Sequence, residues 1–282
     1  MALPEDFDLH DFVQRTLAED LGKGGDVTSN ATIAADAHFT AEMSCRQAVV
    51  LAGLEIAAEF FRALDADVKI DLSAKDGDRV VHGTTVMRLA GKARAMLTAE
   101  RSALNTLQHL CGIATMTRQY VDAIAGTGAV LIDTRKTIPG LRVLEKYAVR
   151  MGGAQNHRMR LDDGVLIKDN HVAVSGGVAE AVRKAKTANT GLQVQVEVDR
   201  IDQIEPALEA GADRLLLDNM DPAMLREAVK LVAGRVPLEA SGGVTLETIR
   251  FIAETGVNFI SVGRITQSAP AVDIGLDYAL SR

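Results

Sequence analysis

Short apolar stretches and amphipathic segments alternate along the first 112 residues. An apolar repeat of three to four residues predicts helices at 9–18 and 54–64. The segment 75–78, Lys-Asp-Gly-Asp, predicts a tight turn, because Asp and Gly tolerate the dihedral angles of a reversal. Strands are predicted at 38–53, 67–72 and 84–91. This mixture predicts an α+β layer with some antiparallel pairing.

A long helical pattern from about residue 93 to residue 124 follows this region. Gly112 lies within the pattern and is a candidate break, because Gly destabilises a helix interior. We therefore expect an N-terminal domain at 1–112, completed by 271–282, and a second domain at 113–270.

From about residue 130 the rhythm changes to short apolar strands that alternate with amphipathic helices, which predicts a parallel sheet covered by helices. An α/β barrel and a doubly wound sheet both fit. Nearly every strand ends in a residue type common in active sites, which favours a TIM-like barrel. The predicted strands are 130–135, 165–170, 192–198, 214–219, 237–243 and 259–264, and the predicted helices are 141–153, 178–187, 203–212, 223–232 and 246–254.

Composition sets broad limits on the kind of protein. No run approaches the roughly 18 apolar residues that suggest a membrane span, and the acidic N-terminus lacks the basic and apolar regions of a secretory signal. Two cysteines, Cys45 and Cys111, are too few for a disulfide framework and fit a reducing compartment. We therefore expect a cytoplasmic protein without a membrane partner.

The net charge of −7 argues against a nucleic-acid partner. Between residues 135 and 171, however, eight Lys and Arg stand against four Asp and Glu, a local charge of +4. A basic segment in an acidic protein indicates a site for a small, multiply charged anion.

Cationic side chains follow the predicted strands, and in a parallel barrel these positions meet at one mouth. Arg grips a carboxylate or phosphate with a planar fork, whereas Lys supplies a compact charge. Three other cations, Arg142, Lys146 and Arg150, are spaced as on an exposed helix face. The cations expected in the site are Arg135, Lys136, His157, Arg158 and Lys168.

Carboxylates and glycines end the remaining strands. Glu197 and Asp218 suit Mg²⁺, which prefers oxygen ligands and keeps several waters. The turn Ser241-Gly242-Gly243 is expected to enter a helix, whose N-terminus would seat a phosphate. With a second glycine turn at Gly263, the pattern is similar to the paired phosphate loops of barrels.

Segment 133–171, DTRKTIPGLRVLEKYAVRMGGAQNHRMRLDDGVLIKDNH, resembles the signature of the quinolinate phosphoribosyltransferase family. Further matches, in the expected order from about residue 18 to 275, are EDLGKGGDVTS, ERSALNTLQHLCGIAT, VEVD, LLLDNM, LEASGGV and ISVGRITQSAP. The chain departs from the family pattern at Ala154-Gln155, where Gly-Val is expected, and at Met159-Arg160. We expect the Arg160 side chain to point to solvent, as surface Arg usually does.

The resemblance implies an N-terminal α/β sandwich joined to an incomplete α/β barrel, in a homodimer. It implies that Arg101 reaches the partner's site and holds a substrate carboxylate. Arg135, His157, Arg158 and Lys168 would line the quinolinate pocket, beside Thr134, and Lys136 would contact the phosphorylated sugar. Glu197 and Asp218 would hold the ribose hydroxyls and Mg²⁺, and Ser241, Gly242, Gly243 and Gly263 would seat the 5′-phosphate.

The implied reaction joins quinolinate to the ribose of phosphoribosyl pyrophosphate and releases CO2 and pyrophosphate, giving nicotinate mononucleotide. Lys136, Glu197 and Asp218 would be catalytic, with Mg²⁺ and without an organic cofactor. A related branch associated with molybdate transport shares the fold, but the EKYAVR and IKDNH segments favour quinolinate. A Schiff-base lyase using Lys136 or Lys168, and a non-catalytic sugar-phosphate-binding barrel, are the alternatives.

Overall fold

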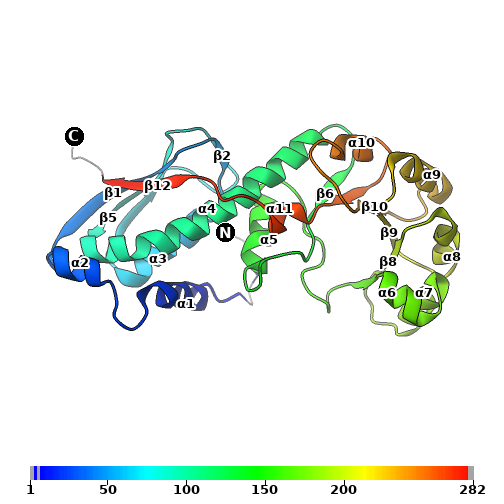
Figure 1. Ribbon diagram of the computed structural model, residues 1–282, viewed down its shortest axis with the longest axis horizontal. Helices are drawn as coiled ribbons and strands as arrows, with labels where there is room; N and C mark the ends of the chain where they lie inside the picture. The colour runs from blue at the N-terminus through cyan, green and yellow to red at the C-terminus, as the bar shows by residue number, and fades with distance from the viewer. Residues whose placement is uncertain (1–2, 5–6, 279–282) are drawn as a thin grey trace. The chain divides into compact units, whose positions relative to one another are not determined.

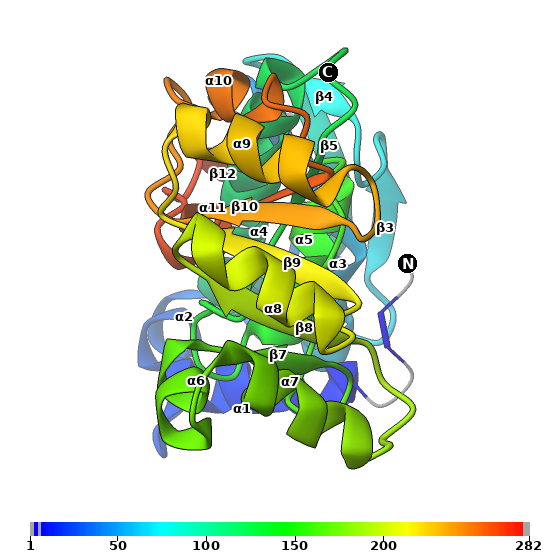
Figure 2. The same ribbon diagram turned by 90° about the vertical axis from the view of Figure 1, so that its right-hand side faces the viewer.

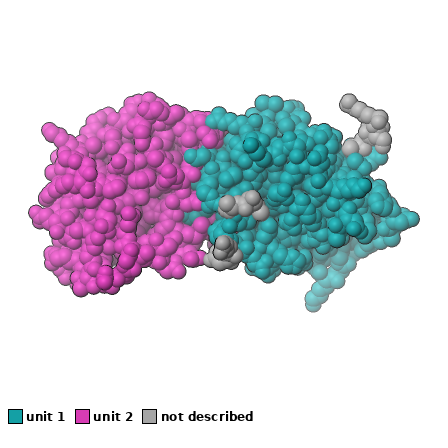
Figure 3. Space-filling model, turned by 180° about the vertical axis from the view of Figure 1, so that it is seen from behind, with its two compact units in different colours: residues 1–116, 143–153, 268–282 teal, residues 117–142, 154–267 magenta. Residues whose placement is uncertain are grey.

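The computed structural model describes residues 3–4 and 7–278. Figure 3 shows two compact units, the first built from residues 1–116, 143–153 and 268–282 and the second from 117–142 and 154–267. Residues 143–153, which the sequence analysis assigned to the second domain, belong to the first unit. None of the helices in the described part of the chain combines the length and apolar character that a membrane crossing requires.

The first unit contains a four-stranded antiparallel sheet in the order β12-β1-β5-β3 and a small sheet of β2 and β4. Its elements, labelled in Figure 1, are α1 (Leu9–Leu21), α2 (Val27–Thr32), β1 (His38–Cys45), β2 (Val49–Val50), α3 (Leu54–Leu64), β3 (Lys69–Leu72), β4 (Arg79–Val80), β5 (Thr85–Lys92), the first part of α4 (Ala93–Ala123), most of α5 (Arg142–Met151) and β12 (Ile274–Tyr278). The helix predicted at 54–64 and the turn at Asp76-Gly77 are confirmed.

Helix α4 runs without interruption through Gly112, so the predicted break is wrong. A Cβ at this position would lie 2.1 Å from the carbonyl oxygen of Pro270. Gly112 is therefore required for the close approach of another backbone segment, which the sequence pattern did not reveal.

Helix α5 also departs from the sequence interpretation, because its charged residues do not form an exposed face. Lys146 and Glu145 are both 0% exposed, and Glu145 Oε1 lies 2.9 Å from Nε2 of His109. Arg142 donates to the hydroxyl of Thr137 and the carbonyl of Met159. The helix is thus a buried, polar-paired element of the core.

The second unit is a six-stranded parallel sheet in the order β6-β11-β10-β9-β8-β7. Strands β7 to β11 pair in chain order and β11 returns to β6, while the described residues show no pairing of β6 with β7. This is the strand order of a barrel with one pair left open, which confirms the parallel α/β sheet. Its elements are β6 (Val130–Ile132), β7 (Val165–Ile167), α6 (Asp169–Ser175), α7 (Val178–Thr187), β8 (Val194–Val198), η1 (Ile201–Gln203), α8 (Ile204–Glu209), β9 (Arg214–Asp218), α9 (Pro222–Val232), β10 (Leu238–Ser241), α10 (Ile249–Ala253), β11 (Phe259–Ser261) and α11 (Arg264–Gln267).

Burial on both sides of the sheet explains why its strands are nearly continuous apolar runs. The centres of β8 and β9 are buried, and Figure 2 shows helices α7, α8 and α9 lying across the sheet. Helix α9 begins where Asp221 accepts hydrogen bonds from the backbone of Ala223 and Met224, with Pro222 in the first turn. This local signal sets where the β9–α9 unit turns, and the parallel pairing of the strands places their carboxyl ends at one rim.

Candidate active site

A cavity of about 780 Å³ lies in the second unit, where the strands end. Its volume is within the range of small-molecule sites. Every predicted site residue of this unit lines it, namely Thr134, Arg135, Lys136, His157, Arg158, Lys168, Glu197, Asp218, Ser241, Gly242, Gly243 and Gly263. The parallel sheet therefore brings together residues as far apart in the chain as Thr134 and Gln267.

Arg101, Arg142 and Arg160 are not among the described residues that line the cavity. Arg101 is exposed on α4 in the first unit. Arg160 is 57% exposed and its Nε lies 3.2 Å from Asp162, as expected for a side chain that points to solvent. The departure from the family pattern at Arg160 therefore lies outside the cavity.

Two hydrogen bonds fix the loop after β6. The backbone N–H of Lys136 donates to the hydroxyl of Thr134 at 3.0 Å, and the hydroxyl of Thr266 donates to the carbonyl of Lys136 at 2.7 Å. A Cβ on Gly263 would lie 2.7 Å from Cδ of Lys136. Glycine at 263 therefore lets the lysine side chain pass close to the backbone after β11.

The turn after β10 needs glycine for two reasons. Gly242 has a φ of +97°, and a Cβ there would lie 2.2 Å from Oδ1 of Asn219. The Asn219 N–H donates to the carbonyl of Ser241 at 2.9 Å, which ties this turn to the end of β9. The expected helix does not follow directly, because α10 starts only at Ile249. The prediction of a helix N-terminus at this turn is wrong, since residues 244–248 form loop and turn.

For two of the carboxylates that line the cavity, Glu197 and Asp218, the surroundings disfavour the ionised form. Burial and the neighbouring Asp218 raise the pKa of Glu197, although Lys168 opposes the shift. Burial also raises the pKa of Asp218, while a hydrogen bond from Asn219 and the charge of Lys136 oppose it. A cation bound between these groups would offset this effect.

The cations are crowded as well. Burial and the charge of Arg135 lower the pKa of Arg158, whose Nη1 donates to the carbonyl of Gly164 at 2.8 Å. Nε of Arg135 is buried and has no hydrogen-bond partner among the described residues. An anion in the cavity would satisfy this donor and offset the repulsion.

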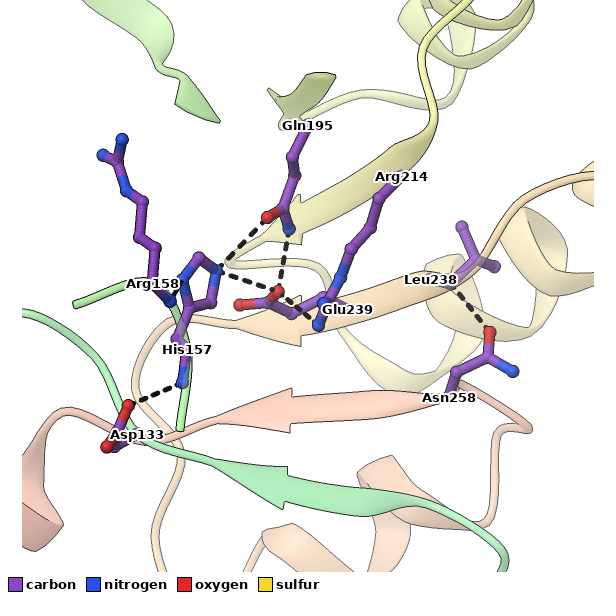
Figure 4. A network of polar contacts seen from close by, with 8 residues as sticks. All are labelled: Asp133, His157, Arg158, Gln195, Arg214, Leu238, Glu239 and Asn258. Carbon is purple, nitrogen blue, oxygen red and sulfur yellow. Dashed lines mark hydrogen bonds and ion pairs between the residues drawn. The ribbon is translucent and has the colours of Figure 1, made fainter. Parts of the chain in front are cut away.

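Around the His157 ring lies a buried polar network that the sequence pattern did not reveal (Figure 4). Glu239, 1% exposed, forms an ion pair with Arg214 at 2.8 Å and accepts a hydrogen bond from Gln195 at 2.8 Å, and its Oε2 lies 3.5 Å from Nε2 of His157. Asp133 accepts the His157 backbone N–H at 2.8 Å. The available signals were Glu239 inside one apolar strand and Arg214 at the start of another, because buried Glu and Arg are rare unless paired.

Family models match nearly the whole chain. The quinolinate phosphoribosyl transferase N-terminal domain matches residues 26–111, and the C-terminal domain of the same family matches residues 113–277.

Curated and solved relatives match over most of their length. The probable nicotinate-nucleotide pyrophosphorylase [carboxylating] of Bacillus subtilis is 44% identical over 93% of this chain and 91% of its own. The enzyme of that name from Mycobacterium leprae is 42% identical over 95% and 96%. The solved nicotinate-nucleotide pyrophosphorylase of Francisella tularensis superposes with a TM-score of 0.93 at 41% identity, covering 99% of this chain and 98% of that one. The chain belongs to the quinolinate phosphoribosyltransferase family.

Proposed function

We propose that the cavity of the second unit is the active site of a nicotinate-nucleotide pyrophosphorylase (carboxylating), the NAD-biosynthetic activity that membership of this family gives the chain. The reaction transfers the phosphoribosyl group of phosphoribosyl pyrophosphate to quinolinate and releases CO2 and pyrophosphate. The observation that carries the proposal is the convergence of five Lys and Arg side chains with two carboxylates of raised pKa in one cavity.

Quinolinate would occupy the cationic part of the cavity. It carries two adjacent carboxylates, and Arg135, Arg158 and Lys168 supply charges of the opposite sign. Two Arg forks can each hold a carboxylate through paired N–H groups. The unpartnered Nε of Arg135 supports this position, because a substrate carboxylate would give it an acceptor.

The phosphorylated sugar would occupy the glycine-lined part. Gly242 and Gly243 both have positive φ values, and Gly263 lies beside Lys136. Backbone N–H groups without side chains around them let a phosphate approach closely. Ser241 and Lys136 would add a hydroxyl and a charge, so these residues would seat the 5′-phosphate and the pyrophosphate.

Glu197 and Asp218 fit Mg²⁺ as a shared ligand pair. Among the described residues, no group of three or more His, Cys, Asp or Glu side chains is arranged to hold a metal ion alone. Mg²⁺ is commonly held by one or two carboxylates together with substrate phosphates and water. When bound, it supplies positive charge to the departing pyrophosphate.

The residues of the chain would act through electrostatics and alignment. As the bond to pyrophosphate weakens, the ribose gains positive charge, and the ionised Glu197 and Asp218 stabilise it. Arg135, Arg158 and Lys168 hold the pyridine nitrogen of quinolinate in line for attack at the ribose carbon. After N-alkylation, loss of CO2 leaves an electron pair on the ring carbon beside the positively charged nitrogen. That charge stabilises the pair until a proton from water adds to the carbon, so decarboxylation requires no organic cofactor.

The oligomeric part of the proposal concerns Arg101. It is exposed on α4, outside the described lining of the cavity, and in a homodimer it would enter the partner's site and hold a substrate carboxylate. The free, buried Cys45 and Cys111 support a reducing compartment such as the cytoplasm.

Turnover of purified protein with quinolinate, phosphoribosyl pyrophosphate and Mg²⁺ tests the proposal, with nicotinate as the parallel acceptor. We expect nicotinate mononucleotide from quinolinate and none from nicotinate, because only quinolinate satisfies all the cations. No product from quinolinate would refute the assignment. Borohydride trapping of Lys136 or Lys168 with a carbonyl substrate would support a lyase instead.

A further inference from the structure

We propose that Glu239 is a positioning residue of the active site, which fixes the proton of His157 and thereby leaves that ring with no N–H for the substrate. The inference rests on the proposed function for its kinetic consequence, but the hydrogen-bond chain itself is independent of the reaction. Figure 4 shows the residues involved.

The first group in this series of contacts is the ionised carboxylate of Glu239, which accepts hydrogen bonds but cannot donate them. Glu239 lies in the buried part of β10, and Arg214 from β9 pairs with its Oε2 at 2.8 Å. Although burial opposes ionisation, the hydrogen bond from His157 and the charge of Arg214 hold the pKa of Glu239 below its usual value. The guanidinium of Arg214 also stacks on Phe259, 3.9 Å from the ring centroid. Every polar group that faces Oε2 must therefore donate to it.

The carboxylate of Glu239 in turn sets the orientation of the Gln195 amide. Its Nε2 donates to Oε2 of Glu239 at 2.8 Å, and this assignment follows because a carboxylate cannot donate. The amide oxygen of Gln195 then faces Nε2 of His157 at 3.2 Å. A flipped amide would place two acceptors against each other, so the carboxylate fixes the amide.

His157 is left with one consistent arrangement. Its Nε2 faces two acceptors, Gln195 at 3.2 Å and Glu239 at 3.5 Å, and so carries the proton. Its Nδ1 accepts the backbone N–H of Arg158 at 2.7 Å. Both ring nitrogens are therefore engaged within the protein. His157 orients the backbone of Arg158 and shapes the pocket, while the substrate carboxylates are left to the surrounding cations.

The test removes the buried ion pair as a unit. Glu239→Leu with Arg214→Met leaves no uncompensated charge, and such replacements are often tolerated. Its matched control, Glu205→Leu with Arg235→Met, removes an ion pair outside the cavity, where both side chains are more than 40% exposed. Glu239→Gln keeps an acceptor for the network without its charge and serves as the conservative rescue.

Two measurements test the proposed role of Glu239. Nitrogen-15 NMR of labelled histidines reports which ring nitrogen carries the proton, and the His157→Asn spectrum identifies the signals of this residue among the six histidines. Steady-state kinetics separate the KM for quinolinate from kcat and from the KM for phosphoribosyl pyrophosphate.

We expect the Nε2–H form of His157 in the wild type and in Glu239→Gln, and its loss in the double variant. In that double variant the KM for quinolinate should rise about tenfold, roughly 1.4 kcal/mol, with kcat within about threefold. Adding His157→Asn should raise it no further, because both changes act through one ring. The control should match the wild type.

A proton on Nδ1 of His157 in the wild type would overturn the proposal, as would an unchanged KM and tautomer in the folded double variant. If that variant does not fold, the wild-type and Glu239→Gln spectra still decide. Failure of the wild type to use quinolinate would remove the proposed function and leave the tautomer result standing.

Discussion

Replacing Gly242 with alanine tests how the phosphate turn is built. The added Cβ would lie 2.2 Å from Oδ1 and 2.9 Å from the backbone nitrogen of Asn219, at a φ of +97°. A left-handed backbone costs an L-residue about 1–2 kcal/mol, and an overpacked site typically costs about 1–3 kcal/mol more. We therefore expect Gly242→Ala to lose roughly 2–5 kcal/mol.

Gly243→Ala is the matched control, because Gly243 also has positive φ, +60°, but a Cβ there would meet nothing within 4 Å. It should lose only the backbone part, about 1–2 kcal/mol. At about 2–4 °C per kcal/mol for a domain of this size, thermal unfolding should separate the two variants by at least about 2 °C.

The kinetic effect should also be larger for Gly242→Ala than for Gly243→Ala. Displacing Asn219 disturbs its hydrogen bonds to Asp218 and Ser241, so Gly242→Ala should raise the KM for phosphoribosyl pyrophosphate more than Gly243→Ala. Combining Gly242→Ala with Asn219→Ala should recover part of the lost stability, since the closest clash is with the Asn219 side chain. Equal Tm and KM values in the two single variants would refute this account.

Three further predictions concern the helix, the carboxylates and the dimer. Gly112→Ala should lower Tm, because the added Cβ would lie 2.1 Å from the backbone carbonyl oxygen of Pro270. This clash should outweigh the roughly 1 kcal/mol by which alanine normally stabilises a helix relative to glycine. A raised Tm would contradict the close approach of the Pro270 backbone. Because the pKa values of Glu197 and Asp218 are raised, the two groups lose their charge as pH falls through those values, and kcat/KM should fall at a higher pH than ordinary carboxyl groups would give. Saturating Mg²⁺ should move this acidic side of the pH profile to lower pH. An acidic side that Mg²⁺ does not move would argue against this pair as its ligands. Arg101→Ala and Lys168→Ala should each abolish turnover without a change in Tm, and mixing the two inactive proteins should restore part of it; no recovery after verified subunit exchange would place Arg101 outside the shared site.

The strand-end residues show how far sequence reasoning reached. Parallel strands with functional residues after them must converge at one rim, so Lys168, Glu197 and Asp218 were placed in one cavity from order alone. Helices with a clear apolar repeat, such as α3, were located to the residue. The family followed from motifs spread over most of the chain, which the comparisons confirm.

Lys146, Gly112 and Glu239 mark the limit. Charges at helical spacing usually face water, yet Lys146 is fully buried, and this burial depends on a neighbouring element that sequence spacing does not contain. Gly112 resembles a helix breaker until the backbone around Pro270 is placed against it. Glu239 looks like one polar residue in an apolar strand until Arg214, Gln195 and His157 surround it.

The sequence by itself determined the alternation of strands and helices, the family and the residues at the strand ends, because these depend on local periodicity and on order along the chain. Only the tertiary structure decided which charges are buried, where a glycine must admit another backbone, and which groups face the two ring nitrogens of His157. Those properties depend on contacts between residues far apart in sequence, and a linear pattern contains no information on their distances.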